Sequence, residues 1–209
     1  MKLNFNMLTE LQKLQAINTH LIFRLMIKNI LITGNPGCGK TTLIKEILKE
    51  LKIPARGFIT EEIRKNARRT GFKIITLDGK EGILAKEGIR SPYQVSKYGV
   101  ILKYLEEIGV NEIEEGLKDD SLIVVDEIGK MELFSQKFRE AILKALDSKN
   151  RILGTIMLKP NPFCDKIKAR MDTKIFYLTR ENFLEVKGEI AKFFIKDVFP
   201  FNDNKGKGN

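Results

Sequence analysis

The chain has 209 residues, of which 43% are apolar and 31% are charged, so it is long enough for one globular domain with its own core. Its 37 basic and 27 acidic residues give a formal charge of +10, which favours polyanionic partners such as phosphorylated small molecules or nucleic acid. One histidine, His20, and two cysteines, Cys38 and Cys164, argue against a histidine-based triad, a zinc site or a disulfide framework in the main body, and favour a reducing cytoplasm.

The first 25 residues read differently from the rest of the chain. Apolar residues recur at three- and four-residue spacing in 1–25, which indicates an amphipathic helix that is too polar for a signal peptide. This extension could pack on the body, bind a partner, or come from an over-extended start-codon assignment. We favour the third interpretation, because Met26 begins a compact strand. The polar tail, 200–209, is predicted to be disordered, and no apolar window is long enough for a membrane span.

Between these ends, predicted strands and helices alternate along the domain 26–199. Strands are expected at 28–33, 122–125, 151–158 and 174–178, and helices at 41–51, 93–108, 133–148 and 179–194. Residues 56–63 and 70–77 flank a basic link and predict a two-stranded ribbon within an insertion near 56–98. Strands separated by helices predict an α/β fold, a three-layer sandwich with a mostly parallel sheet and helices on both faces. Ligands of such sheets bind at the carboxyl ends of the strands.

The first predicted strand runs directly into the segment GNPGCGKTT, which matches the P-loop pattern G-x-x-x-x-G-K-[ST]. Glycines allow the loop to turn its backbone amides inward, and the following helix directs its positive dipole end to the same place. Lys40 can then bridge the β- and γ-phosphates of a nucleotide, Thr41 can offer its hydroxyl to magnesium, and Cys38 is interpreted as a small filler. The predicted nucleotide-binding residues are Gly34, Asn35, Pro36, Gly37, Cys38, Gly39, Lys40, Thr41 and Thr42.

A P-loop needs a second acid to hold magnesium, and only the stretch LIVVDE fits this role well. Asp126 is the predicted metal residue. Glu127, directly after it, is the predicted catalytic base, placed to orient a water in line with the γ-phosphate and to accept its proton. Strand neighbours point to opposite faces, but this objection weakens where the strand ends. Glu61 and Glu62 are rival bases, if their strand lies beside the P-loop strand.

Phosphoryl transfer also favours a cation on the charge that develops at the phosphate. The candidates are Lys130, just beyond the two acids, and four arginines of the insertion, Arg64, Arg68, Arg69 and Arg90. Thr155 can sense the γ-phosphate or its water if its strand neighbours LIVVDE. After the last strand, Arg180 and Asn182 are candidate contacts to the nucleotide base.

Several of these motifs together resemble a known family. GNPGCGKTTL, GFITEEIR, RRTGF, VVDEIGKMELFS and ILGTI are similar to the nucleoside-triphosphatase family first described from hyperthermophiles, to which the vertebrate cancer-related nucleoside-triphosphatase belongs. The resemblance covers Met26 to about Ile195. It implies magnesium-dependent hydrolysis of ATP, GTP and other nucleoside triphosphates to diphosphates with little base selectivity. It also implies a P-loop ATPase fold in which an extra strand separates the P-loop strand from the Walker B strand.

Two other functions compete with hydrolysis. The insertion could serve as the lid of a nucleoside or polynucleotide kinase, although no motif marks an acceptor pocket. The charge of +10 is compatible with a nucleotide-switched module that binds nucleic acid, although no basic run with interleaved aromatic residues supports it. The expected partners are therefore nucleoside triphosphates, with Mg²⁺ as cofactor, no membrane and a monomeric state.

Overall fold

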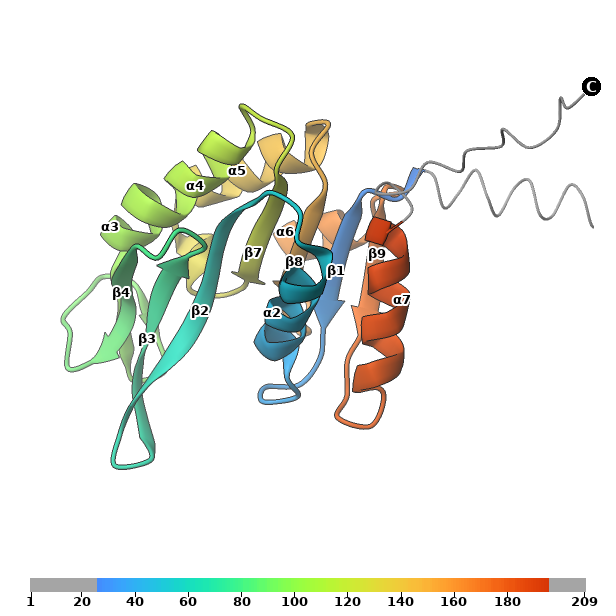
Figure 1. Cartoon of the computed structure of the whole chain (residues 1–209). Coiled ribbons are helices and arrows are strands. Elements are labelled where there is room, and N and C mark those ends of the chain that lie inside the picture. Colours follow the sequence, from blue (N-terminus) through green and yellow to red (C-terminus); the bar gives the residue numbers. More distant parts are fainter. Residues whose placement is uncertain (1–25, 196–209) are drawn as a thin grey trace, which may run out of the picture.

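The computed structural model describes residues 26–195. The expectations for the extension 1–25 and the tail 200–209 lie outside this range. Within it, no helix is long and apolar enough to cross a membrane. The described part of the chain folds around one large sheet, so the predicted α/β class is confirmed (Figure 1).

The sheet has nine strands in the order β5-β6-β4-β3-β2-β7-β8-β1-β9. One half is parallel and consists of β1 (Asn29–Thr33), β2 (Ala55–Lys65), β7 (Leu122–Ile128), β8 (Ile152–Ile156) and β9 (Thr173–Tyr177). The other half is antiparallel and adds β3 (Arg68–Thr76), β4 (Glu81–Glu87), β5 (Gln94–Val95) and β6 (Tyr98–Val100). The sheet is therefore mixed, with its parallel half carrying the P-loop. As the resemblance implied, one strand, β8, separates the P-loop strand β1 from β7.

Helices cover both faces of the sheet, as the alternating pattern predicted (Figure 1). One face packs α2 (Lys40–Leu51) and α7 (Phe183–Ile195), and the other packs α4 (Asn111–Gly116), α5 (Gln136–Asp147), α6 (Pro162–Lys168) and a π-helical turn, η1 (Leu105–Val110). A short helix, α3 (Leu102–Tyr104), precedes η1, and a 3-10 turn, η2 (Glu132–Phe134), precedes α5. Along β7, Leu122 and Val124 face α2 while Ile123 and Val125 face α5, which is why its sequence is a continuous apolar run.

Two helices begin where their sequences supply a cap. Ser135 accepts a hydrogen bond from the backbone N–H of Phe138 at the start of α5. Asn161 accepts from two backbone N–H groups of α6, whose first residue is Pro162. The helix α6 was not predicted, because its seven residues are too few to show a helical period.

The predicted helix at 93–108 is wrong in its first half. Residues 94–100 form the small strands β5 and β6, and helical structure begins only at Leu102. Gly99 explains the difference, because a Cβ at this position would lie 2.1 Å from the backbone oxygen of Ile89. The close approach of two backbones, which favours a strand glycine, therefore overrides the apolar spacing of this segment. The predicted ribbon is formed by β2 and β3, which pair antiparallel. It is not separate from the main sheet, because β2 also pairs with β7.

We predict that Gly57→Ala destabilises the fold strongly. Gly57 lies in β2 with φ +124°, and a Cβ there would come within 2.0 Å of the Val124 backbone oxygen on β7. Because a backbone atom cannot step aside, the free energy of unfolding should fall by about 3 kcal/mol or more, measured by urea denaturation. Gly79 is the matched control, since it has φ +95° but open space at the Cβ position. Gly79→Ala should cost about 1 kcal/mol, and equal losses in both variants would contradict the close β2–β7 approach.

Candidate functional site

The P-loop connects β1 to α2 at the carboxyl end of the sheet. Gly34 must lack a side chain, because a Cβ would lie 2.4 Å from the backbone oxygen of Leu178. Gly39 precedes α2 with φ +103°, and no side chain caps this helix, so its first amides remain available to an anion. The Lys40 ammonium donates to the carbonyl oxygens of Gly34 (3.0 Å) and Asn35 (3.3 Å), which folds its side chain back across the loop. Cys38 is buried beside Gly34, as expected of a small filler.

Asp126 is the buried centre of the site. Its Oδ2 accepts a hydrogen bond from the hydroxyl of Thr41 (2.6 Å) and a longer one from the backbone N–H of Thr60 (3.4 Å). Its Oδ1 accepts from the hydroxyl of Thr155 at 3.1 Å. Burial raises the pKa of Asp126, and the hydrogen bonds from these three residues oppose the rise. The carboxylate thus joins α2, β2 and β8 to its own strand, β7.

An irregularity in β7 lets two consecutive acids serve one cavity. The pairing of β7 with β8 shifts register between Val125 and Ile128. As a result Ile128 packs on the same face as Val125, although a regular strand would turn it to the opposite face. Asp126 and Glu127 lie within this shift, and both line the cavity that the P-loop borders. The sequence predicted a strand that ends at the acids, whereas the strand continues and bulges there.

Glu127 is a half-buried carboxyl group on the wall of this cavity. Burial raises the pKa of Glu127 and the neighbouring Asp126 adds to the rise, while the Lys40 ammonium opposes it. The side chain lies against Gly129, where an added Cβ would be 2.9 Å from the Glu127 Cγ. A carboxylate with a raised pKa, close to the Lys40 ammonium, is suited to accept a proton from water.

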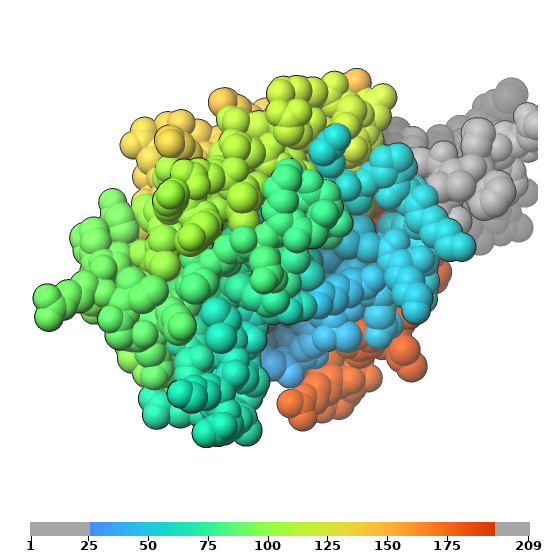
Figure 2. All heavy atoms as spheres, turned by 60° about the vertical axis from the view of Figure 1, so that its left-hand side comes forward, coloured from blue at the N-terminus to red at the C-terminus, as the bar shows by residue number. Residues whose placement is uncertain are grey.

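The cavity itself has a volume of about 640 Å³ and runs from the P-loop to the β2–β3 hairpin. Figure 2 shows the surface hollowed between this hairpin (teal) and the P-loop with α2 (blue). The lining residues include Pro36, Gly37, Gly39, Lys40, Thr41, Thr42, Thr60, Glu61, Glu62, Arg69, Phe72, Asp126 and Glu127. A second branch of about 420 Å³ shares Pro36, Lys40, Thr60, Phe72 and Glu127 with it and extends to Lys130, Met131, Glu132, Met157 and Lys159.

The two rival bases line the cavity, but each is held by cations. Glu61 pairs with Lys45 at 2.6 Å, and this contact lowers the pKa of Glu61. Glu62 pairs with Arg69 at 2.7 Å and with Arg64 at 2.5 Å, and these contacts lower the pKa of Glu62. Their strand, β2, lies beside β7 and not beside the P-loop strand, so the expected neighbour was wrong.

The candidate cations divide by position. Arg64 lies on the exposed end of β2, where it pairs with Glu62 and donates to the Ala67 oxygen, and Arg68 pairs with Glu87 at 2.9 Å. Neither arginine lines the cavity, nor does Arg90. Arg69 lines the main cavity, and Lys130 lines the second branch, which Lys40 and Glu127 also line.

The remaining predicted residues lie on two other strands. Thr155 lies on β8, next to β7 as expected, and reaches Asp126. Arg180 follows β9 and extends to the Gly37 oxygen of the P-loop at 3.5 Å. Asn182 accepts from the Thr179 N–H and donates to the Tyr177 oxygen, so its amide is engaged within its own loop.

One residue of this region was not predicted from the sequence. Glu132 lies in η2 on the wall of the second branch, and its side chain is buried. Burial raises the pKa of Glu132 to about 8, and the nearby Glu127 carboxylate contributes to the rise. An acid between the two apolar residues Met131 and Leu133 was the available signal, but the same pattern is typical of the segment before a helix.

Comparisons with known proteins agree with the resemblance stated from the motifs. A model of the NTPase family matches residues 29–191. The nucleoside-triphosphatase THEP1 of Thermotoga maritima is 54% identical over 161 residues, which cover 77% of this chain and 92% of that protein. The human cancer-related nucleoside-triphosphatase is 39% identical over 173 residues, covering 75% and 91% of the two chains. The crystal structure of THEP1 from Aquifex aeolicus superposes with a TM-score of 0.72 at 38% identity, over 79% of this chain and 98% of that one.

We predict that Glu132 makes stability fall as the pH rises. The folded chain keeps this carboxyl protonated up to a pH of about 8, whereas the unfolded chain releases the proton near the ordinary glutamate pKa of 4.5. Between these values the folded state binds the extra proton, so its contribution to the free energy of unfolding falls by up to about 1.4 kcal/mol per pH unit.

Glu132→Gln removes the titration of this carboxyl group. Glu127 is present in both the variant and the unaltered chain, so the difference between them reports on Glu132. The stability of the variant relative to the unaltered chain should therefore increase from about pH 5.5 to about pH 8 in urea denaturation with EDTA present. A difference that stays constant across this range would contradict the raised pKa of Glu132.

Proposed function

The chain belongs to the NTPase family, and from this premise we propose that it hydrolyses nucleoside 5′-triphosphates to the diphosphate and phosphate. The observation that carries the proposal is that a single cavity is lined by the P-loop, by the Thr41–Asp126 pair and by Glu127. We assign the fold to the P-loop NTPases, since β1, the glycine loop and α2 have the connectivity of that motif. The two unpaired cysteines fit the proposed cytoplasmic setting.

The phosphate chain is the part of the substrate for which the site is built. The first amides of α2 have no side-chain cap, and Lys40, Thr41 and Thr42 line the cavity; uncapped amides and an ammonium both favour anionic oxygens. Lys40 is held by two carbonyl oxygens, which the β- and γ-phosphates can replace as partners. Every nucleoside triphosphate shares these groups, which supports activity on ATP, GTP and others with broad base specificity.

Thr41 and Asp126 are the residues that would hold magnesium. Their oxygens lie 2.6 Å apart at the cavity wall, and a hydroxyl with a carboxylate is the hard oxygen pair that this ion accepts beside water and phosphate. Asp126 is buried and has no ion-pair partner in the described structure, so a cation would offset the cost of burying its charge. When bound, Mg²⁺ neutralises charge on the β- and γ-phosphate oxygens.

Glu127 is the proposed base. Its carboxylate accepts a proton from a water molecule whose oxygen attacks the γ-phosphorus, while the bond from that phosphorus to the β–γ bridging oxygen breaks. The diphosphate leaves with the electrons of that bond, and the proton passes through Glu127 to solvent or product. Glu61 and Glu62 fit this role less well, because ion pairs lower their pKa values, whereas burial raises the pKa of Glu127.

We predict that the purified chain releases phosphate from ATP and from GTP with magnesium and no added acceptor. Water is the acceptor in the proposed reaction, so a coupled phosphate assay should show turnover, and EDTA should abolish it. Release that stays negligible until a nucleoside or an oligonucleotide is added would contradict hydrolysis and establish the kinase alternative. Salt-sensitive binding of RNA that depends on the bound nucleotide, without turnover, would indicate the nucleic-acid module.

We predict that Glu127→Gln retains nucleotide binding but loses about 100-fold or more in kcat, because the amide cannot accept the proton. Binding of a fluorescent ATP analogue should remain within about threefold of the unaltered chain. Glu61→Gln is the matched comparison, since Glu61 lines the same cavity but is held by Lys45. A large kcat loss in Glu61→Gln with near-normal turnover in Glu127→Gln would transfer the base assignment to Glu61.

A further inference from the structure

The proposed reaction also needs a cation besides Lys40, and neither the rest of the P-loop nor the two acids supply one. Negative charge spreads over the oxygens of the transferred phosphoryl group, and a cation beyond Lys40 stabilises it in related chemistry. Among the described residues that line the main cavity, Lys40 and Arg69 are the cations. Lys40 belongs to the P-loop, whereas Arg69 comes from the antiparallel half of the sheet and approaches from the opposite wall.

Arg69 is held in place by partners on three elements. It lies on β3 opposite Arg64 of β2, and its guanidinium donates to the Glu62 carboxylate at 2.7 Å and to the Tyr98 hydroxyl at 3.3 Å. The Tyr98 hydroxyl in turn donates to the Arg69 backbone oxygen at 3.4 Å. The guanidinium carbon lies 5.1 Å from the centre of the Phe72 ring, within cation–π distance.

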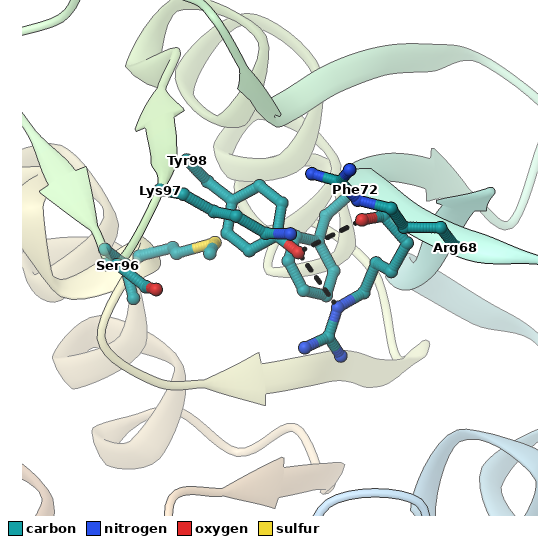
Figure 3. A pocket seen from close by; sticks show the side chains of 8 residues that line it. Arg68, Phe72, Ser96, Lys97 and Tyr98 are labelled. Carbon is teal, nitrogen blue, oxygen red and sulfur yellow. Dashed lines mark hydrogen bonds between the residues drawn. The ribbon is translucent and has the colours of Figure 1, made fainter. Parts of the chain in front are cut away.

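Figure 3 shows a neighbouring cavity of about 370 Å³, which Arg69, Phe72 and Tyr98 also line. The labelled rings of Phe72 and Tyr98 lie next to each other, with centres 5.3 Å apart. The Tyr98 hydroxyl accepts from the Arg69 side chain and donates to the Arg69 backbone oxygen. Tyr98 is buried, so these rings form a fixed support for the arginine. The Arg69 side chain nevertheless keeps 42% of its surface exposed, which leaves it accessible to a ligand in the main cavity.

The contact with Glu62 can be exchanged at low cost. Glu62 also pairs with Arg64 at 2.5 Å, so its charge keeps a partner when Arg69 turns to a phosphate. The exchange replaces one exposed ion pair with another, and exposed pairs contribute little to stability. The Arg69 guanidinium also has only a short distance to move. Its partner Glu62 lies two residues along β2 from Thr60, about 7 Å at the usual strand rise, and the Thr60 N–H contacts Asp126.

We propose that Arg69 is a catalytic residue that donates hydrogen bonds to the γ-phosphate oxygens and stabilises the transition state within the same chain. The inference rests on the proposed hydrolysis and adds to it the source of the catalytic cation. A planar guanidinium can contact two phosphate oxygens at once, which an ammonium cannot do with fixed geometry. Arg64 and Arg68 lack a position on the cavity, and Lys130 lies on the other branch.

The test compares Arg69→Ala with Arg68→Ala. Arg68 is the matched control, because it is adjacent on β3 and equally cationic but pairs with Glu87 outside the cavity. Arg69→Ala should lose about 100-fold or more in kcat, by comparison with the roughly 10³–10⁵ of known catalytic arginines, while nucleotide affinity changes less than about threefold. Arg68→Ala should keep kcat within about threefold. If the unaltered chain is active and the two variants have equal rates, the catalytic role of Arg69 is overturned, whereas the proposed hydrolysis is not.

Two further measurements separate chemistry from structure. Guanidinium ion added at millimolar concentration should restore part of the turnover of Arg69→Ala, and trapping of ADP with aluminium fluoride should be lost in this variant. Arg69→Lys keeps the charge without the planar fork and should remain at least about tenfold slower than the unaltered chain. A slow Arg69→Ala protein that traps ADP–aluminium fluoride normally and does not respond to guanidinium would show a merely structural role.

A mixing experiment tests whether Arg69 acts within its own chain. Lys40→Ala has an intact Arg69 but a disabled P-loop, whereas Arg69→Ala has the reverse. Turnover of the mixture should equal the sum of the separate rates, and restored turnover would overturn action within one chain. Absence of phosphate release from the unaltered chain would instead contradict the proposed hydrolysis, so the two failures are distinguishable.

Discussion

The Asp126 carboxylate is the contact on which the rest of the site depends. A buried carboxylate is costly unless donors surround it, and here the donors come from three separate elements. Thr41 on α2, the Thr60 amide on β2 and Thr155 on β8 all converge on this one group. None of these elements can shift far from β7 without leaving part of the charge unsatisfied. The same geometry that satisfies Asp126 therefore places the P-loop helix, the β2–β3 hairpin and the two acids around one cavity.

The register shift in β7 solves the problem that two neighbouring acids present. In a regular strand Glu127 would point to the α5 face and away from the P-loop. Between Val125 and Ile128, β7 has one residue more than β8, so Ile128 packs on the same face as Val125. Both acids lie between these two residues. The cost is a short interruption of the β7–β8 ladder. As a result the buried Asp126 and the half-buried Glu127 have different environments, which suits the separate metal-binding and proton-accepting roles that we propose for them.

The sequence predicted the parts of the fold that local pattern determines. The P-loop, α2, α5 and the parallel strands were found because glycines, a helical period and apolar runs lie within a few residues of each other. The strands β5 and β6 were missed, because YQVSKYGVILKYL has helical spacing and only the non-local contact of Gly99 with Ile89 decides against it. The pairing of β2 with β3 was predicted, but the neighbour on its other side was wrong, since strand order depends on contacts far apart in the chain. Glu132 escaped notice because its burial comes from tertiary packing.

The two halves of the sheet divide the proposed chemistry between them. The parallel half presents the groups that would bind phosphate and metal, all at the carboxyl ends of β1, β7 and β8. The antiparallel half brings a second wall, with Arg69 supported by Phe72 and Tyr98 and balanced by Glu62. Before a nucleotide binds, this ion pair satisfies both charges. In the proposed mechanism the nucleotide competes with Glu62 for Arg69, and Glu62 keeps Arg64, with which it is already paired. A strand added beside β2 can therefore contribute a cation that many phosphate-binding loops must obtain from a second protein.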